Sequence, residues 1–328
     1  MTDALASAAT PSLPASGRGR TGARAWPERP YVEGPELDAA LDRADADPAA
    51  RAFARELAET GLARLDLGPD ATALCDAVLA DVEPLFEDPS VYRVQDAWLR
   101  SPAVRRLAAL PALVDALSLA YGRPAFPFQT LNFRRGSQQG LHSDAIHFHS
   151  DPPLFMCGVW IALEDVRPEA GPLTYVPGSH KLPVLTMRAA GVDRSRPSQA
   201  DYSRTYLPAL GARLAASGLP QAEALPRKGE ALVWAANLAH GGAPILDAAA
   251  TRRSLVVHFY FDGCVYYTPM FSDVEAGRLA VRLPANVATG LWAWPRRRGR
   301  RVAPQPSAVV GCCRKLLTRQ PLVTRIAA

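Results

Sequence analysis

The pattern of apolar and polar positions changes character at about Phe128. Before this point, the spacing predicts helices over 48–59, 71–85 and 102–120, the last interrupted by Pro111, and a first strand over 62–67. Asp47 can cap the first of these helices, Pro48 suits its first position, and the pattern ends before Gly61. We therefore expect a layer of helices ahead of the main β structure.

After Phe128, short β-type runs are separated by Gly and Pro residues, which is typical of antiparallel sandwiches and barrels. The segment 199–226 has a helical pattern and is interpreted as an insertion between strands. We predict a mainly β fold with flanking helices (α+β), built on a double-stranded β-helix, the jelly-roll or cupin-like core. The predicted strands are 128–134, 155–163, 172–176, 230–234 and 254–261.

The composition is that of an ordinary globular protein, with 48% apolar and 21% charged residues. The sequence shows neither an apolar stretch of membrane-spanning length nor a secretory signal pattern. Five scattered cysteines form neither a disulfide framework nor a zinc-knuckle spacing. These features lead us to expect a cytoplasmic protein.

Composition also suggests three parts. Residues 1–30, rich in Ala, Ser, Pro, Gly and Arg, are expected to be a disordered leader, and residues 31–290 the main folded domain. Residues 291–328 form a basic C-terminal extension that holds nine of the 37 Lys and Arg residues and none of the 32 acidic residues. The rest of the chain is therefore slightly acidic.

The extension has several interpretations. A basic run beside an apolar segment can contact an anionic membrane surface or an acidic carrier protein. Because charge runs usually solvate, we favour a solvated, partly disordered extension, and no nucleic-acid partner is expected.

Candidate metal ligands lie in His142-Ser143-Asp144, with His240 far downstream. Side chains at i and i+2 of a strand project from the same face, so His142 and Asp144 can reach one ion together. A second imidazole, from His240, would complete a two-His-one-carboxylate triad with open coordination positions, which suits iron(II) and O2 chemistry. A structural zinc site would instead close with four protein ligands.

Three other histidines compete with these candidates. His149-Ser150-Asp151 has the same form, but it runs into Pro152-Pro153 and is expected to be a loop after the site. His147 is a second distractor. His180 follows the Pro177-Gly178 turn signal and is interpreted as a loop-stabilising residue.

An arginine pair follows His240, at Arg252 and Arg253. A dicarboxylate cosubstrate needs a fixed cation away from the metal, and the guanidinium group binds carboxylates bidentately. Arg252 shares a strand face with Ser254, Val256 and His258, whereas Arg253 shares one with apolar residues. We favour Arg252 as the carboxylate ligand, with Arg253 as the alternative.

Together these motifs resemble the phytanoyl-CoA dioxygenase family of iron(II)/2-oxoglutarate enzymes. The resemblance runs from about residue 55 to 265. The matching pieces are Leu131-Asn132-Phe133, Gly136-Ser137-Gln138-Gln139, His142-Ser143-Asp144, the stretch from Gly158 to Asp165, Gly171-Pro172-Leu173, Pro177-Gly178-Ser179-His180-Lys181, His240-Gly241-Gly242 and Arg252-Arg253-Ser254.

The resemblance implies that His142, Asp144 and His240 bind Fe²⁺ and that Arg252 binds the C5 carboxylate of 2-oxoglutarate. It also suggests Asn132 near the cosubstrate and Trp160 packed beside it. Two features depart from the family. Gly242 stands where members often have Ser, and the spacing from His240 to the arginines is longer by about one residue, which keeps Arg253 as an alternative.

The expected activity is O2-dependent hydroxylation of a small organic or lipid-like substrate, with 2-oxoglutarate converted to succinate and CO2. Related halogenases lack the carboxylate that Asp144 provides, so its presence favours hydroxylation. The alternatives are a cupin-like metal-dependent oxygenase that does not use 2-oxoglutarate and a non-catalytic binding protein on the same barrel.

Overall fold

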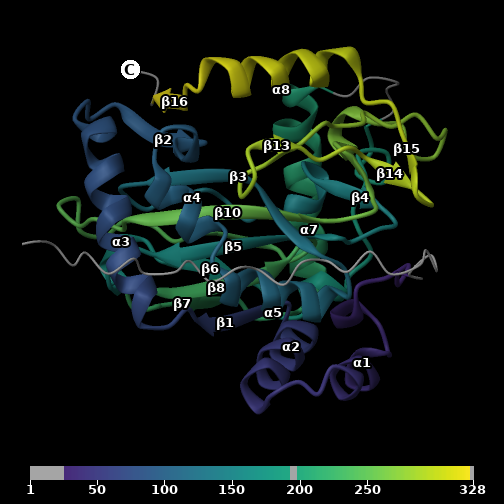
Figure 1. The fold of residues 1–328 in the computed structure, drawn as a ribbon, viewed down its shortest axis with the longest axis horizontal. Helices are drawn as coiled ribbons and strands as arrows, with labels where there is room; N and C mark the ends of the chain where they lie inside the picture. The colour runs from purple at the N-terminus through teal and green to yellow at the C-terminus, as the bar shows by residue number, and fades with distance from the viewer. Residues whose placement is uncertain (1–25, 193–197, 326–328) are drawn as a thin grey trace, which may run out of the picture.

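A computed structural model describes residues 26–192 and 198–325. The largest sheet has seven antiparallel strands and runs through the middle of the molecule (Figure 1). From one edge to the other, its strands are β1 (Leu62–Asp66), β8 (Glu230–Ala235), β5 (Met156–Ala162), β10 (Ser254–Phe261), β3 (Ala125–Phe133), β2 (Val91–Gln95) and β16 (Leu322–Arg325). Neighbouring strands of this sheet are far apart in sequence, so its register places distant motifs side by side.

Smaller sheets complete the barrel. One has the order β7 (Ala222–Ala224), β6 (Leu173–Tyr175) and β9 (His240–Gly242), and a second pairs β11 (Val265–Tyr267) with β4 (His149–Asp151). The minor strand pairs are β12 (Ala285–Asn286) with β13 (Leu291–Trp292), and β14 (Arg296–Arg297) with β15 (Arg300–Arg301). The predicted double-stranded β-helix with flanking helices is confirmed.

Helices cover one face of the large sheet. Successive side chains of a strand point to opposite faces, and Val159, Val233 and Val257 all point into the main apolar core shared with the helices. The opposite face, with Trp160, Trp234 and Val256, belongs to a separate cluster toward the smaller sheet. The helices that precede β3 in the sequence are α1 (Leu37–Arg43), α2 (Pro48–Thr60), α3 (Pro69–Val82), α4 (Pro102–Ala108) and α5 (Pro111–Tyr121).

Capping residues, prolines and glycines explain where these helices begin and end. The Asp47 carboxylate accepts a hydrogen bond from the Ala50 amide over 2.8 Å at the start of α2, and Gly61 ends this helix in the left-handed conformation. Pro111 occupies the first position of α5, so it separates two helices instead of kinking one. The helices predicted over 48–59, 71–85 and 102–120 are thus confirmed, the second followed by a short 3-10 turn, η2 (Glu83–Phe86).

Two local predictions are wrong. The segment His149–Asp151 is not a loop but forms β4, because its backbone pairs with β11. The insertion is helical over α6 (Gln199–Asp201), the π-helical turn η7 (Tyr202–Tyr206) and α7 (Leu207–Ser217), but it ends in the strand β7. The remaining short turns are η1 (Tyr31–Glu33), η3 (Ala97–Leu99), η4 (Asp144–Ile146), η5 (Pro168–Ala170), η6 (Ser179–Lys181) and η8 (Pro269–Phe271).

The predicted leader falls largely on residues 1–25, which lie outside the described residues. Its last residues contact the body of the protein. The Arg123 guanidinium donates to the Pro27 carbonyl over 2.6 Å and lies 5.4 Å from the ring centre of Trp26. Trp26 and Pro27 therefore pack on the body of the protein, within the range assigned to the leader.

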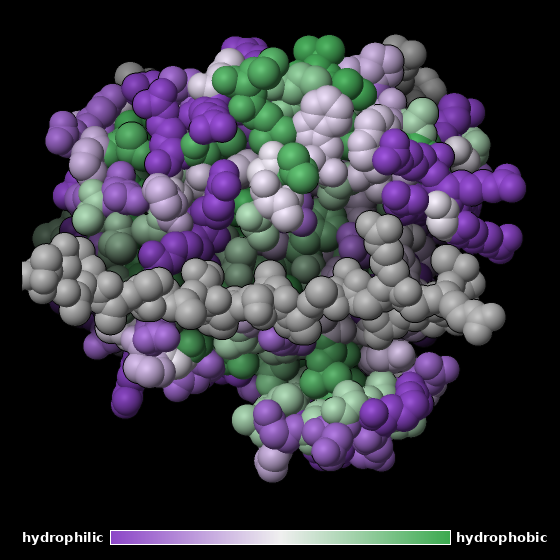
Figure 2. Space-filling model, viewed as in Figure 1, coloured by the Kyte–Doolittle hydropathy of each residue, from purple (hydrophilic) through white to green (hydrophobic). Residues whose placement is uncertain are grey.

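The expectation of a partly disordered C-terminal extension is wrong for residues 291–325. Helix α8 (Pro306–Thr318) lies across one end of the molecule, and β16 then adds an edge strand to the large sheet beside β2 (Figure 1). Lys315 forms an ion pair with the buried Asp96 over 2.7 Å, and Cys312 is buried. Figure 2 shows apolar surface on the outer side of this region, to which the exposed Val310 and Leu317 contribute.

Within residues 26–192 and 198–325, none of the helices combines the length and apolar character needed to span a membrane.

Candidate metal centre

The backbone holds His142 and His240 directly opposite each other. The His142 amide donates to the His240 carbonyl and the His240 amide donates to the His142 carbonyl, each over 2.9 Å. This antiparallel bridge lies at the end of β9 and places the two ring centres 4.4 Å apart. Two histidines separated by almost a hundred positions in sequence thus share one site.

Hydrogen bonds to carbonyl groups orient both rings. Nδ1 of His142 lies 3.0 Å from the Gly140 carbonyl oxygen, and Nδ1 of His240 lies 3.0 Å from that of Leu238. A carbonyl partner accepts from a protonated Nδ1, which leaves Nε2 with a free lone pair. Both Nε2 atoms face Asp144, at 3.9 Å from Oδ1 for His142 and 3.7 Å from Oδ2 for His240.

The sequence pattern predicted that His142 and Asp144 lie on one strand. In the structure, Asp144 lies outside any regular strand. Ser143 is extended, its hydroxyl accepts from the Ala145 amide, and Asp144 opens the short turn η4. The turn still directs the carboxylate toward both histidines. The donor atoms of His142, Asp144 and His240 all lie within 4.8 Å of one another, and all three residues are buried.

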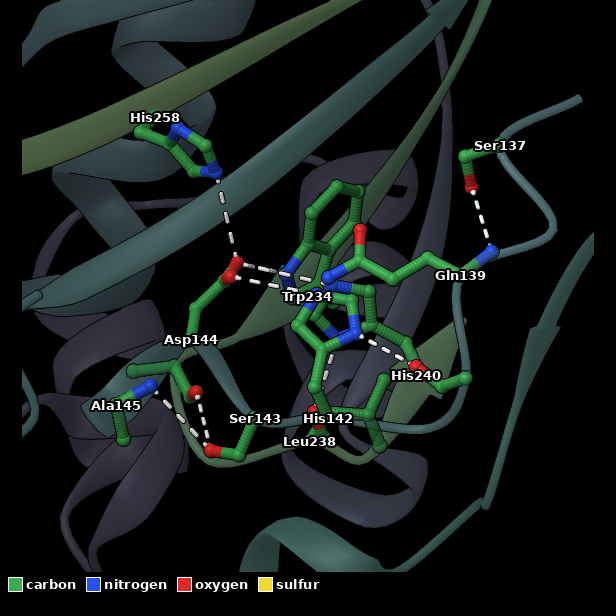
Figure 3. A network of polar contacts seen from close by, with 12 residues as sticks. Ser137, Gln139, His142, Ser143, Asp144, Ala145, Trp234, Leu238, His240 and His258 are labelled. Atoms are coloured by element: carbon green, nitrogen blue, oxygen red, sulfur yellow. Dashed lines mark hydrogen bonds and ion pairs between the residues drawn. The ribbon is translucent and has the colours of Figure 1, made fainter. Parts of the chain in front are cut away.

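Two further side chains contact the carboxylate from the large sheet (Figure 3). The Trp234 indole donates to Oδ2 of Asp144 over 2.8 Å. Nε2 of His258 lies 3.6 Å from the same oxygen, while its Nδ1 lies 3.0 Å from Oε1 of Gln129. Neither residue was singled out from the sequence. The signal for His258 was its place on the same strand face as Arg252.

Burial and neighbouring groups set the ionisation of the site. Burial, and after it the nearby His240, lowers the pKa of His142 to about 4, so this imidazole is neutral at physiological pH. Burial alone would raise the pKa of Asp144, but His240 and His258 hold it well below its usual range. The ionised Asp144 beside the neutral His142 suits a divalent metal ion, which binds deprotonated ligands.

A cavity of about 400 Å³ extends from these ligands over the large sheet. We call it the metal cavity. Its walls include Trp160 of β5, Leu131 of β3 and Arg93 of β2, while Leu173 and His240 close it from the smaller sheet. A cavity between the two sheets of a jelly roll can enclose a small ligand next to the metal ligands.

The two arginines of the pair have different surroundings. Arg252 is buried in the wall of the metal cavity, where it donates to the Gly171 carbonyl over 2.6 Å and lies 5.5 Å from the Trp160 ring centre. Burial lowers its pKa to about 10, so it stays cationic. Arg253 instead forms ion pairs with Glu83 and Glu164. Because successive side chains point to opposite sides, Arg252 lies in the cavity wall and Arg253 lies outside the cavity.

Asn132 does not line the metal cavity. It is fully buried on the opposite face of β3 from Leu131, and its register partners Val94 and Leu255 belong to the main core. Strand alternation excludes its side chain from the cavity that its neighbours line. Trp160 does line it, and the indole nitrogen of this residue has no hydrogen-bond partner among the described residues.

The competing histidines have other contacts. His149 lies in β4, with Nδ1 3.2 Å from the Tyr267 hydroxyl, and His180 lies 3.2 Å from the Ala58 carbonyl oxygen. His147 lines the metal cavity and packs against Tyr202, with ring centres 4.8 Å apart. None of the three belongs to the ligand cluster found among the described residues.

The glycines after His240 allow a loop to approach closely. A Cβ on Gly241 would lie 2.6 Å from the Gln139 carbonyl oxygen, and one on Gly242 would lie 2.8 Å from the Ser137 hydroxyl oxygen. Both distances are too short for real contacts. Gly242 stands where family members often have Ser. Here the side chain of Ser137 lies beside Gly242, and Ser137 lines the metal cavity.

Several solved structures share this fold. The carbocyclase SnoK from nogalamycin biosynthesis is 18% identical over 77% of this chain and 93% of its own, with a TM-score of 0.54. The epimerase SnoN from the same biosynthesis is 21% identical over 67% of this chain and 86% of its own, with a TM-score of 0.52. EctD from S. alaskensis with 2-oxoglutarate and 5-hydroxyectoine is 18% identical over 78% of this chain and 84% of its own, with a TM-score of 0.51.

No curated protein matches the chain at a significant level. The family model described as phytanoyl-CoA dioxygenase (PhyH) matches residues 43–254, which include all three candidate metal ligands and Arg252. This match covers more than half of the sequence, and the chain therefore belongs to the phytanoyl-CoA dioxygenase family of iron(II)- and 2-oxoglutarate-dependent oxygenases.

Proposed function

We propose that this protein hydroxylates an unactivated C–H bond of a small organic or lipid-like substrate and converts 2-oxoglutarate to succinate and CO2. Its family uses Fe²⁺, 2-oxoglutarate and O2. One observation carries the proposal. His142, His240 and Asp144 converge in the wall of the metal cavity, and the buried cation Arg252 lies elsewhere in the same wall.

The residues fit the cofactor and the cosubstrate. His142, Asp144 and His240 would hold the iron, since two imidazoles and one carboxylate leave open positions for other ligands. Arg252 would bind the far carboxylate of 2-oxoglutarate, because its buried Nε has no hydrogen-bond partner among the described residues. Bound iron(II) with these cosubstrates supplies the oxidant for the C–H bond.

The protein's own part is positioning and shielding. Trp234 and His258 fix the carboxylate of Asp144, and the indole of Trp160 packs against the Arg252 guanidinium. The burial of His142, Asp144 and His240 limits the access of water to the reacting groups. No protein acid or base is needed for the hydrogen abstraction. The presence of Asp144 favours hydroxylation over halogenation, because a halide would need the place that this carboxylate occupies.

Anaerobic titration tests the cosubstrate site. Adding iron(II) and then 2-oxoglutarate to the wild-type protein should produce a weak visible metal-to-ligand charge-transfer band. In Arg252→Ala, the affinity for 2-oxoglutarate should fall about 10–100-fold, because a charge-assisted hydrogen bond is worth about 1.5–3 kcal/mol. Arg253→Ala is the matched control and should keep wild-type affinity, since Arg253 pairs with Glu83 and Glu164 outside the cavity. Equal affinities in all three proteins would exclude Arg252 as the ligand.

Turnover separates this function from its alternatives. O2-dependent formation of succinate is expected from the proposed oxygenase, and neither a cupin-like oxygenase that ignores 2-oxoglutarate nor a non-catalytic binding protein would produce it. A cytoplasmic location stays a prediction from cysteine usage. The five cysteines are all unpaired.

A further inference from the structure

A second arginine, Arg282, reaches the metal cavity from the segment that follows β11. Its Nη1 donates to the Thr268 hydroxyl over 2.9 Å, and its guanidinium carbon lies 4.9 Å from the ring centre of Phe148. Its Nε is buried and has no hydrogen-bond partner in the described part of the chain. The side chain is therefore held in place while part of its hydrogen-bonding capacity is unused.

Arg282 also lacks a counterion. Among the described residues, no carboxylate lies within ion-pair distance of its guanidinium, whereas the nearby Arg278 pairs with Asp273 and Arg188 pairs with Glu275. A partly buried cation without a counterion is costly unless a ligand supplies the missing negative charge. Together with the unused Nε, the missing counterion leaves Arg282 able to bind an anionic group.

The charges of the metal cavity support the same conclusion. Its wall holds three arginines, Arg93, Arg252 and Arg282, but Asp144 is the only carboxylate among its described lining residues. The charges of bound iron(II) and 2-oxoglutarate cancel, so the loaded site would remain positive. An anionic substrate would be attracted to it, and a cationic one would be repelled.

Position separates Arg282 from the cosubstrate site. Arg252 lies ahead of Ser254, which pairs with Phe133, whereas His258 pairs with Gln129 farther along the same strands. Arg282 lies near this second end. Its guanidinium packs on the ring of Phe148, and the ring centres of Phe148 and His258 are 4.9 Å apart. The two arginines therefore enter the metal cavity from different elements, Arg252 from the residues just before β10 and Arg282 from the segment after β11.

A second space adjoins Arg282. It measures about 520 Å³ and lies beneath α8, between that helix and the residues around Phe128, Leu283 and Ala285. We call it the α8 chamber. Arg282, Thr268, Phe271 and Gln129 line both the metal cavity and the α8 chamber. A molecule held by Arg282 thus has apolar walls available on the side away from the metal ligands.

From these observations we infer that Arg282 binds the anionic group of the substrate, and that the substrate class is organic carboxylates with an apolar body. This inference rests on the proposed function for its catalytic meaning, but the binding of a carboxylate at Arg282 can be measured without turnover. The fork of the guanidinium suits a carboxylate, and the rings of Phe148 and Phe128, 4.9 and 6.0 Å away, suit apolar atoms next to it.

The test measures probe binding to the iron(II)- and 2-oxoglutarate-loaded protein under anaerobic conditions. The probes are hydrocinnamate, octanoate and dodecanoate, each compared with its uncharged primary amide, by ligand-observed NMR and calorimetry. At least one carboxylate should bind the wild type at least 10-fold more tightly than its amide. In Arg282→Met this carboxylate should bind about 10–100-fold more weakly, which corresponds to the loss of one charge-assisted contact, while the affinity of the amide stays unchanged.

The matched control is Arg278→Met, which removes an exposed arginine of the same segment and should bind the carboxylates like wild type. The charge-transfer band must persist in Arg282→Met, which shows that the variant is folded and that its cosubstrate site is intact. Loss of the band together with probe binding would assign Arg282 to 2-oxoglutarate and overturn the inference. So would equal binding of carboxylate and amide, equal binding by wild type and Arg282→Met, or no binding of any carboxylate.

The same experiment distinguishes the two proposals. If wild type lacks the charge-transfer band but binds the carboxylates through Arg282, the oxygenase function fails and the anion site stands. If the band appears and the carboxylates do not bind, the oxygenase function stands and the inference about the substrate fails.

Discussion

Gly158 supports the candidate metal centre through a contact that leaves no room for a side chain. It lies in β5 opposite Trp234 of β8. A Cβ on Gly158 would come within 2.2 Å of Cε2 of the indole and 2.5 Å of its Nε1. Because carbon atoms pack at about 3.5–4.0 Å, Gly158→Ala would force the indole to move by more than about 1 Å. The hydrogen bond from this indole to Asp144 would then break.

The size of the effect follows from these two changes. Overpacking of a core costs about 1–3 kcal/mol of folding free energy, and loss of a hydrogen bond to a charged group costs about 1.5–3 kcal/mol. Removing a contact that orients a metal ligand lowers metal affinity about 10–100-fold. We therefore expect Gly158→Ala to lower both the thermal unfolding midpoint of the apo-protein and its affinity for iron(II).

Thermal unfolding and anaerobic iron(II) titration against a competing chelator measure the two effects. Trp234→Phe removes the hydrogen bond without adding volume, so it should weaken iron binding in the same direction. Gly211→Ala is the control, because a Cβ at this helical position meets nothing within 4 Å, and it should leave iron binding unchanged. If Gly158→Ala kept the wild-type midpoint and iron affinity, the reasoning about Trp234 would be refuted.

Three further predictions concern single side chains. His258→Ala should weaken iron(II) binding about 10-fold or more in the same titration, because this ring lies beside the Asp144 carboxylate; an unchanged affinity would contradict this role. Burial lowers the pKa of His147 from 6.5 to about 4. The unfolded chain therefore takes up the proton first, and stability falls as the pH drops from about 6.5 to 4, by up to roughly 3 kcal/mol. Unfolding midpoints of the apo-protein across this range should fall less in His147→Gln, and parallel pH profiles would disprove the assignment. Lys315→Met should cost about 1–3 kcal/mol in denaturant unfolding, because it leaves the buried Asp96 carboxylate without its cation; a wild-type free energy of unfolding would show that this pair does not anchor α8.

The features that the sequence determined by itself are those set by local interactions. Helix α2 begins at the Asp47 cap and ends at Gly61, and Pro111 separates α4 from α5, because capping and backbone restriction act within a few residues. Strand alternation likewise separated Arg252 from Arg253, since it depends only on neighbouring positions. The chemistry of His142, Asp144 and His240 could be proposed from residue types and spacing.

Tertiary structure decided which distant residues meet. His258 and Trp234 approach Asp144 through the register of β10, β5 and β8, and no local pattern encodes that register. The face of β3 on which Asn132 lies depends on the pairing of that strand with β2 and β10. The basic extension packs on the body through the ion pair of Lys315 with Asp96 and the pairing of β16 with β2, both of which join residues distant in sequence. Long-range pairing is set by the combined packing of the whole core, so short stretches of sequence do not contain it.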